Sequence, residues 1–159
     1  MELYFLRHGI AADVGPAGLG DAGRPLTKEG ITKMQAGARG MRRLGMQLDA
    51  LLSSPLVRAH ETAAIVAREL GLELQLAEKL APGCDMAQLF ALLGEYRAAE
   101  RVMLVGHEPD FSSLIGALTG GSQVLMKKGG LGRVDIEMLE QGAGMLTWLL
   151  PPRVLREAE

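Results

Sequence analysis

An arginine and a histidine stand together where the first apolar run of the chain ends. Leu3–Leu6 is followed directly by Arg7, His8 and Gly9. A neutral imidazole can attack phosphorus, and a neighbouring guanidinium both disfavours protonation of the ring and can hold phosphate oxygens through paired donors. Gly9 allows a sharp turn or a close approach to a ligand. The tripeptide therefore indicates phosphoryl-group chemistry at His8. A surface arginine beside a partly buried histidine is the alternative interpretation.

A second histidine and a second arginine occupy comparable places. His107 comes shortly after the apolar run 101–105, and Arg58 lies early in a helical segment that follows the run 49–52. The carboxyl ends of parallel strands lie along one edge of a sheet, so these side chains can converge on His8. The amide groups at the start of the Arg58 helix are also suited to phosphate oxygens. Taken singly, His107 would be a capping or core histidine and Arg58 a solvated helix residue.

Alternating strand-like and helix-like segments must position these residues. Short apolar runs predict parallel strands, and apolar residues at steps of three and four predict helices between them. The pattern predicts a single three-layer α/β domain over residues 1–159 with a mostly parallel central sheet. The expected strands are 3–6, 49–52, 73–76 and 101–105, and the expected helices are 27–44, 54–70, 86–93 and 110–118.

Three details of this prediction bear on the site and on the tail. Ser54-Pro55 is predicted to supply the N-cap and the first-turn proline of its helix. At about 100° per residue, Arg58 lies roughly 200° from Leu56 and so points away from the apolar stripe. In the tail, 134–139 and 145–150 are predicted as two strands, and Pro151-Pro152 is predicted to end regular structure.

Composition limits the class of protein. With 159 residues and 48% hydrophobic content, the chain can bury one substantial core. A net charge of -2 gives no overall basic field, so neither nucleic acid nor an anionic membrane is expected as a partner. The single cysteine, Cys84, excludes an intrachain disulfide. The chain shows no basic leader and no apolar span, so we expect a soluble, cytoplasmic protein.

The histidines do not predict a metal site. The three of them, at positions 8, 60 and 107, include no close pair at metal-binding spacing, and no second cysteine is available. We interpret His60 as a helix-surface residue. The sequence thus predicts neither a metal nor an organic cofactor.

Three motifs in order resemble those of the histidine phosphatase superfamily: Arg7-His8-Gly9, the segment 53–63 with Arg58, and Gly106-His107-Glu108. The short chain, with Arg24-Pro25-Leu26-Thr27 and the run 105–109, is similar to the SixA-like phosphohistidine phosphatase branch. This likeness extends over essentially the whole chain. It implies a phosphoglycerate mutase-like fold.

The resemblance also assigns roles to the matching residues. It implies that His8 is the nucleophile and becomes a transient phosphohistidine, while Arg7, Arg58 and His107 hold the three equatorial oxygens. The physical interpretation agrees with this, because enzymes of phosphoryl transfer mainly position the reacting groups and neutralise oxygen charge. Two guanidiniums near His8 are expected to favour its neutral, attacking form. Glu108 either orients His107 or starts the next helix.

The general acid is less clearly marked. Asp21, three residues before Arg24, is the favoured candidate and Asp13 the next, with solvated loop carboxylates as the alternative interpretation. Larger members of the superfamily place the acid later, where Glu78 and Asp85 are the nearby candidates. A phosphoramidate leaving group needs less specialised protonation than an alkoxide, so a phosphohistidine substrate tolerates a missing acid.

We therefore expect a metal-independent phosphatase that acts on a phosphohistidine-bearing protein. The chain leaves little room for the insertions that wall the pocket in mutases and sugar phosphatases of the superfamily, and an open site suits a protein surface. Two alternatives stay open. One is a phosphomonoesterase for a small phosphorylated substrate. The other is a binding module without turnover, although such a module has no need of an in-line nucleophile at His8.

Overall fold

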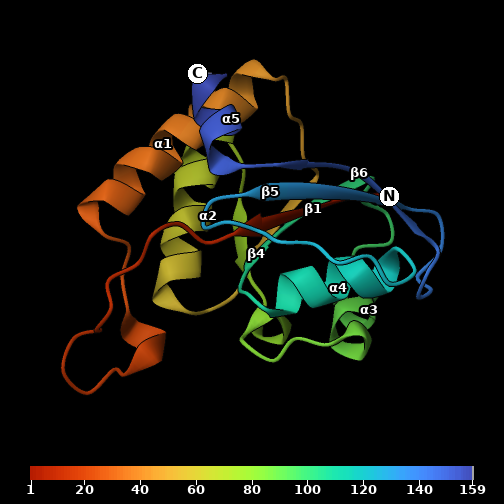
Figure 1. The fold of residues 1–159 in the computed structure, drawn as a ribbon, viewed down its shortest axis with the longest axis horizontal. Coiled ribbons are helices and arrows are strands. Elements are labelled where there is room, and N and C mark those ends of the chain that lie inside the picture. Colours follow the sequence, from red (N-terminus) through yellow and green to blue (C-terminus); the bar gives the residue numbers. More distant parts are fainter. Residues whose placement is uncertain (159) are drawn as a thin grey trace.

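The computed structural model describes residues 1–158, and it contains one six-stranded sheet between two layers of helices (Figure 1). The strand order is β3-β2-β4-β1-β5-β6. The first four strands run parallel, while β5 runs antiparallel to β1 and β6 antiparallel to β5. The strands are β1 (Glu2–Arg7), β2 (Ala50–Ser53), β3 (Leu74–Leu76), β4 (Arg101–Gly106), β5 (Leu131–Ile136) and β6 (Gly144–Leu150).

The central strands are apolar on both faces because helices cover both. In β1, Leu3 and Phe5 face the layer that contains α3 (Met86–Gly94) and α4 (Asp110–Leu118). Tyr4 and Leu6 face the layer of α1 (Lys28–Arg43), α2 (Val57–Leu70) and α5 (Pro152–Glu157). Alternate residues of β4 divide in the same way. This two-sided burial explains the continuous apolar runs of the sequence, and the predicted mostly parallel α/β architecture is confirmed.

The start of α1 fixes the loop that follows β1. Thr27 caps the helix by accepting a hydrogen bond from the Gly30 amide at 2.9 Å. Gly30 must be a glycine, because a Cβ there would lie 2.1 Å from the carbonyl oxygen of Ile10. The backbone that follows Arg7-His8-Gly9 therefore lies directly against the first turn of α1.

The structure corrects two predicted helix boundaries. Pro151-Pro152 does not end regular structure, because Pro152 occupies the first turn of the short helix α5. The predicted cap at Ser54 is also wrong, since α2 begins at Val57 after Leu56 and has no side-chain cap. The hydroxyl of Ser54 is used elsewhere, as described below.

The predicted tail strands are present with shifted bounds, at Leu131–Ile136 and Gly144–Leu150. None of the helices in residues 1–158 has both the length and the apolar character needed to cross a membrane.

Candidate active site

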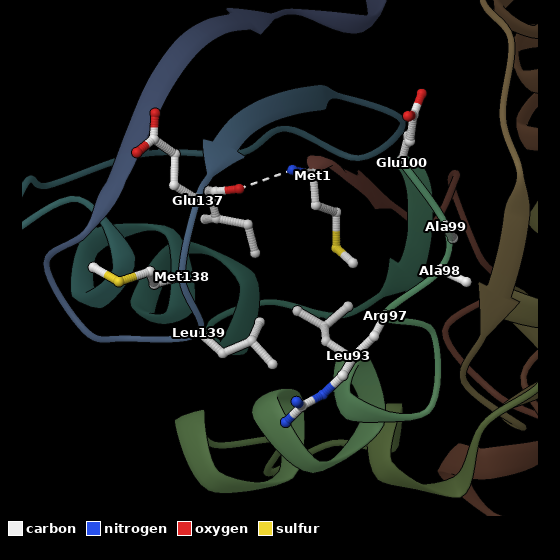
Figure 2. A pocket seen from close by; sticks show the side chains of 10 residues that line it. Met1, Leu93, Arg97, Ala98, Ala99, Glu100, Glu137, Met138 and Leu139 are labelled. Carbon is white, nitrogen blue, oxygen red and sulfur yellow. Dashed lines mark hydrogen bonds between the residues drawn. The ribbon is translucent and has the colours of Figure 1, made fainter.

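The two edges of the sheet differ in the side chains they present. At the amino edge, a cavity of about 600 Å³ is lined by Met1, Arg97, Glu100 and Leu139, among others (Figure 2). The histidines gather at the opposite edge. Arg7 is paired with Gly106 across β1 and β4, which places His8 beside His107. Their ring centroids are 5.3 Å apart, so the carboxyl edge brings together the residues that the sequence singles out.

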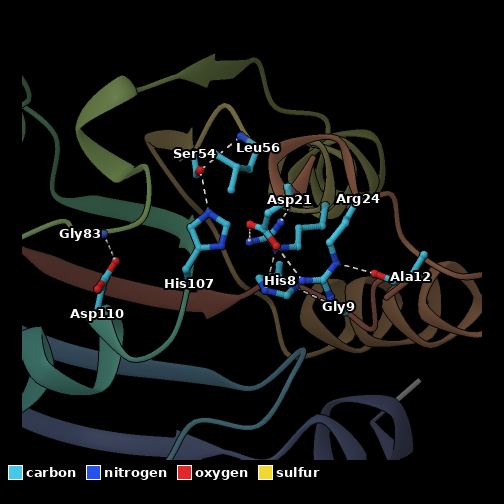
Figure 3. A network of polar contacts seen from close by, with 11 residues as sticks. His8, Gly9, Ala12, Asp21, Arg24, Ser54, Leu56, Gly83, His107 and Asp110 are labelled. Atoms are coloured by element: carbon cyan, nitrogen blue, oxygen red, sulfur yellow. Dashed lines mark hydrogen bonds and ion pairs between the residues drawn. The ribbon is translucent and has the colours of Figure 1, made fainter. Parts of the chain in front are cut away.

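His8 is buried and presents one nitrogen for attack. Its Nδ1 lies 2.8 Å from the carbonyl oxygen of Gly9, and its Nε2 accepts a hydrogen bond from Nε of Arg58 at 3.3 Å (Figure 3). A carbonyl oxygen can only accept, so Nδ1 carries the proton and Nε2 carries the lone pair. This tautomer is the one that a nucleophile at Nε2 requires.

The His8 ring is also held neutral. Burial lowers its pKa to about 3, and the positive charges of Arg58 and Arg7 act in the same direction, as does His107 when it is protonated, while the Gly9 hydrogen bond opposes them. The two guanidiniums were expected from the sequence to favour the neutral ring. In the structure they contribute, but desolvation is the larger cause.

His107 has a ring nitrogen without a partner that faces the site. Its Nε2 lies 2.7 Å from Oγ of Ser54, which also accepts a hydrogen bond from the Leu56 amide at 3.3 Å. When the Ser54 hydroxyl donates to Nε2, the proton of the neutral ring is on Nδ1. That Nδ1 is buried, has no partner within residues 1–158, and lies on the His8 side of the ring (Figure 3). It can donate to an oxyanion.

Burial and the nearby Arg58 charge lower the pKa of His107 to about 4. His107 is therefore a neutral hydrogen-bond donor, and the permanent positive charge of the site comes from the arginines.

Arg58 lies in the first turn of α2 and is buried, only 6% exposed. The sequence predicted that Arg58 points away from the apolar stripe of its helix. In the structure this direction leads into the site rather than into solvent. Nη1 donates to the carbonyl oxygen of Asp21 at 2.8 Å, and Nη2 pairs with its carboxylate at 3.0 Å. All three nitrogens of the guanidinium thus have partners when the contact with His8 is included.

Arg7 is the second cation of the site. Its Nη1 donates to the carbonyl oxygen of Met126 at 2.7 Å, and its Nε is buried without a partner within residues 1–158. Burial lowers its pKa, and the charge of Glu108 opposes that shift. Glu108 accepts a hydrogen bond from Ser112 in α4 at 2.6 Å. Of the two interpretations of Glu108, this contact favours a role at the start of α4 over orientation of His107.

Among the candidates for a general acid, Asp21 alone contacts the side chains of the site. Asp21 begins a short 3-10 turn, η1 (Asp21–Gly23), and its carboxylate pairs with Arg24 and Arg58 at 2.8 and 3.0 Å. These two hydrogen bonds, that of Arg24 first, lower its pKa. The carboxylate is therefore ionised in this arrangement, and its role as an acid stays a prediction.

The other candidate acids have different surroundings. Asp85 is the N-cap of α3 and forms a reciprocal capping box with Gln88. Glu78 lies in the 3-10 turn η2 (Glu78–Leu80) and is exposed. Asp13 is exposed on the same loop as Asp21, and both line a shallow cavity there.

Two buried hydroxyls contact the site in ways that the sequence did not predict. Ser54 contacts His107, as described above, and Thr62 joins the catalytic segment to α2. Thr62 accepts from the Gly9 amide at 3.0 Å and donates to the Arg58 carbonyl at 2.7 Å. Both lie in the segment 53–63, which also contains Arg58. The sequence signal that was available is a small polar residue among apolar ones. Ser54 follows the end of β2, and Thr62 lies on the buried face of α2.

Within residues 1–158, no group of three or more His, Cys, Asp or Glu side chains is placed to hold a metal ion. Cys84 is buried, and burial raises its pKa to about 11. His60 is exposed on α2, as expected.

The carboxyl edge of the sheet thus gathers two histidines and two arginines, a set of side chains suited to binding a phosphoryl group. The chain belongs to the histidine phosphatase superfamily (branch 1), whose family model matches residues 3–82.

Two relatives match most of the chain. An uncharacterized protein of Picosynechococcus is 39% identical over 82% of each chain. Phosphohistidine phosphatase SixA of Escherichia coli is 27% identical over 100% of this chain and 99% of its own. A solved structure of the protein histidine phosphatase SixA complexed with tungstate has a TM-score of 0.86, at 24% identity, and covers 98% of this chain and 99% of that one. The likeness places this chain in the SixA-like branch and confirms the predicted phosphoglycerate mutase-like fold.

Proposed function

We propose that this protein removes the phosphoryl group from phosphohistidine on a partner protein, through a phosphohistidine intermediate at His8. The observation that carries the proposal is the state of His8. Its ring is neutral, its Nδ1 proton is directed to Gly9, and its Nε2 lone pair lies against Arg58. An incoming phosphoryl group would meet the nucleophilic atom and a guanidinium together.

In the proposed reaction, Nε2 of His8 forms a bond to phosphorus as the phosphorus–nitrogen bond of the substrate breaks. Arg7, Arg58 and Nδ1 of His107 hold the three equatorial oxygens. The departing imidazole of the substrate takes up a proton from solvent. Water then attacks the phosphorus on His8, phosphate leaves, and the lone pair returns to Nε2.

Two observations support phosphohistidine as the substrate class. The SixA-like relative from Escherichia coli matches over the full length of this chain. In addition, the carboxylate in contact with the site, that of Asp21, is ionised and paired with Arg24 and Arg58. A site without a poised proton donor suits a leaving group that needs little protonation.

The test is phosphate release from a histidine-phosphorylated carrier protein and from an aryl phosphate, with wild type and His8→Ala compared in the presence of a chelator. We expect fast, chelator-resistant release from the carrier that is lost in His8→Ala. Release confined to the aryl phosphate would indicate a small-molecule phosphomonoesterase. Absence of His8-dependent release from both would indicate a binding module.

A further inference from the structure

A second cavity, of about 400 Å³, shares Arg7 with the candidate active site. It lies between the loop after β1, helix α1, the segment before β5 and helix α5. Met34 is on its floor and is buried, whereas Lys127 and Lys128 at its rim are exposed. The cavity thus combines an apolar base with a charged rim.

The charge of this lining has one sign. Five cationic side chains line the cavity, and the lining includes no aspartate or glutamate; the cations are Arg7, Lys33, Lys127, Lys128 and Arg156. The whole chain has a net charge of -2, so this concentration of positive charge is local. Lys33 pairs with Glu29 on α1, but neither Lys127 nor Lys128 has an ion pair within residues 1–158. These two ammonium groups are available to an anion.

The lysine segment is attached to the nucleophile's own backbone. The Gly129 amide lies 3.0 Å from the carbonyl oxygen of Arg7 and 3.1 Å from that of His8, and the Arg7 amide donates to Gly130 at 3.1 Å. Gly129 has a φ of +77°, and a Cβ there would lie 3.0 Å from the sulfur of Met34. The segment therefore has a backbone position fixed relative to His8.

We propose that this cavity is an anion subsite, which binds a second negatively charged group of the substrate while the phosphoryl group lies at His8. The proposal rests on the proposed function and specifies its substrate. On a phosphohistidine protein the second group is a glutamate or aspartate carboxylate near the phosphohistidine. The methylene groups of such a side chain suit the floor around Met34, and its carboxylate suits the lysines. Arg7 lines this cavity and directly precedes His8 in the chain.

Paired substrates test the subsite. Two phosphohistidine peptides differ only in having glutamate or glutamine beside the phosphohistidine, and an aryl phosphate with a carboxyalkyl chain is compared with its methyl ester. The variant is Lys127→Gln with Lys128→Gln. We expect wild type to favour the charged member of each pair by up to about fivefold in kcat/KM, through KM, which is the upper end of what exposed charge pairs contribute. The double variant should remove this preference and leave turnover of the neutral members unchanged.

The control for overall charge is Arg97→Gln, which removes one positive charge where the double variant removes two. Arg97 is an exposed cation at the amino edge of the sheet, beside the cavity drawn in Figure 2, so the variant lowers the overall charge without changing the subsite. It should keep the wild-type preference.

Three results would overturn the subsite. The first is a preference that survives in the double variant, and the second is an equal loss on charged and neutral substrates, which would make the lysine segment merely structural. The third is an equal loss of the preference in Arg97→Gln, which would make it an effect of overall charge. Wild type that turns over neither peptide nor aryl phosphate would instead overturn the proposed function, and the subsite with it.

Discussion

The carboxylate of Asp21 and the guanidinium of Arg58 form an ion pair in the resting site, with Oδ2 and Nη2 3.0 Å apart. Arg58 also donates to the backbone oxygen of Asp21 and to Nε2 of His8. These contacts use three of the five N–H groups of the guanidinium, so an arriving phosphoryl group takes the remaining two or displaces Asp21. The loop carboxylate holds the arginine in place before binding and competes with the substrate during it.

Replacement of Asp21 by asparagine separates competition from acid catalysis. We expect Asp21→Asn to lower KM for a phosphohistidine substrate about threefold and to change kcat little, because the neutral amide competes less strongly for Arg58. Steady-state kinetics measure both. Asp13→Asn, on the same exposed loop, is the control. A fall in kcat of about a hundredfold would instead make Asp21 the general acid.

The hydroxyl of Ser54 is expected to fix the tautomer of His107. In Ser54→Ala the ring loses its Nε2 partner, and we expect kcat to fall about tenfold because Nδ1 no longer always carries the proton. Nitrogen NMR of labelled histidine reports the tautomer directly. Ser53→Ala is the matched control, because Ser53 is equally buried and bonds to the Ser54 carbonyl rather than to His107. Identical tautomers and activities in the two variants would remove this role.

Loss of the Thr62 hydroxyl is expected to lower both the free energy of unfolding and kcat. Thr62→Val keeps the shape but leaves the buried Gly9 amide without an acceptor, which costs about 1–3 kcal/mol. Urea denaturation should show that loss, and kcat should fall with it because Gly9 adjoins the nucleophile. Thr62→Ser retains the oxygen and should recover most of both. If Thr62→Ser is as impaired as Thr62→Val, packing of the methyl group and not the hydrogen bond is responsible.

The lowered pKa of His8 makes stability depend on pH. The folded ring has a pKa of about 3, whereas an unfolded histidine titrates near 6.5. Between these values the unfolded chain binds a proton that the folded chain does not, so the free energy of unfolding falls as the pH falls. From pH 7 to pH 5 this amounts to about 2 kcal/mol for His8.

Urea denaturation of wild type and His8→Gln at the two pH values isolates this contribution. Wild type should lose about 2 kcal/mol more than the variant on acidification. Equal losses would show that His8 is not buried as a neutral ring.

Residues that are brought together by the order of the strands could be predicted from the sequence. Contacts between individual side chains could not. His8 and His107 each come just after an apolar run, so their proximity follows from parallel topology. The Ser54 contact could not be predicted in this way, because Ser54-Pro55 is equally typical of a helix start. Pro152 posed the same problem, since a proline pair can end a strand or begin a helix.

Electrostatics was predictable only in part. The neutral state of His8 was expected from the charges nearby, but its main cause, burial, depends on the packed structure. The ion pairs of Asp21 with Arg24 and Arg58 could not be predicted either, because the loop that contains Asp21 has no regular sequence pattern.

The central claim, that His8 carries the phosphoryl group, is tested most directly by trapping. Wild type and His8→Asn are mixed with a radiolabelled histidine-phosphorylated carrier, quenched within milliseconds under alkaline conditions, and digested for peptide mapping. The account predicts acid-labile, alkali-stable label on the peptide that contains His8 in wild type and none in the variant. Release of phosphate at the wild-type rate with no label on His8, or with label on another residue, would contradict it.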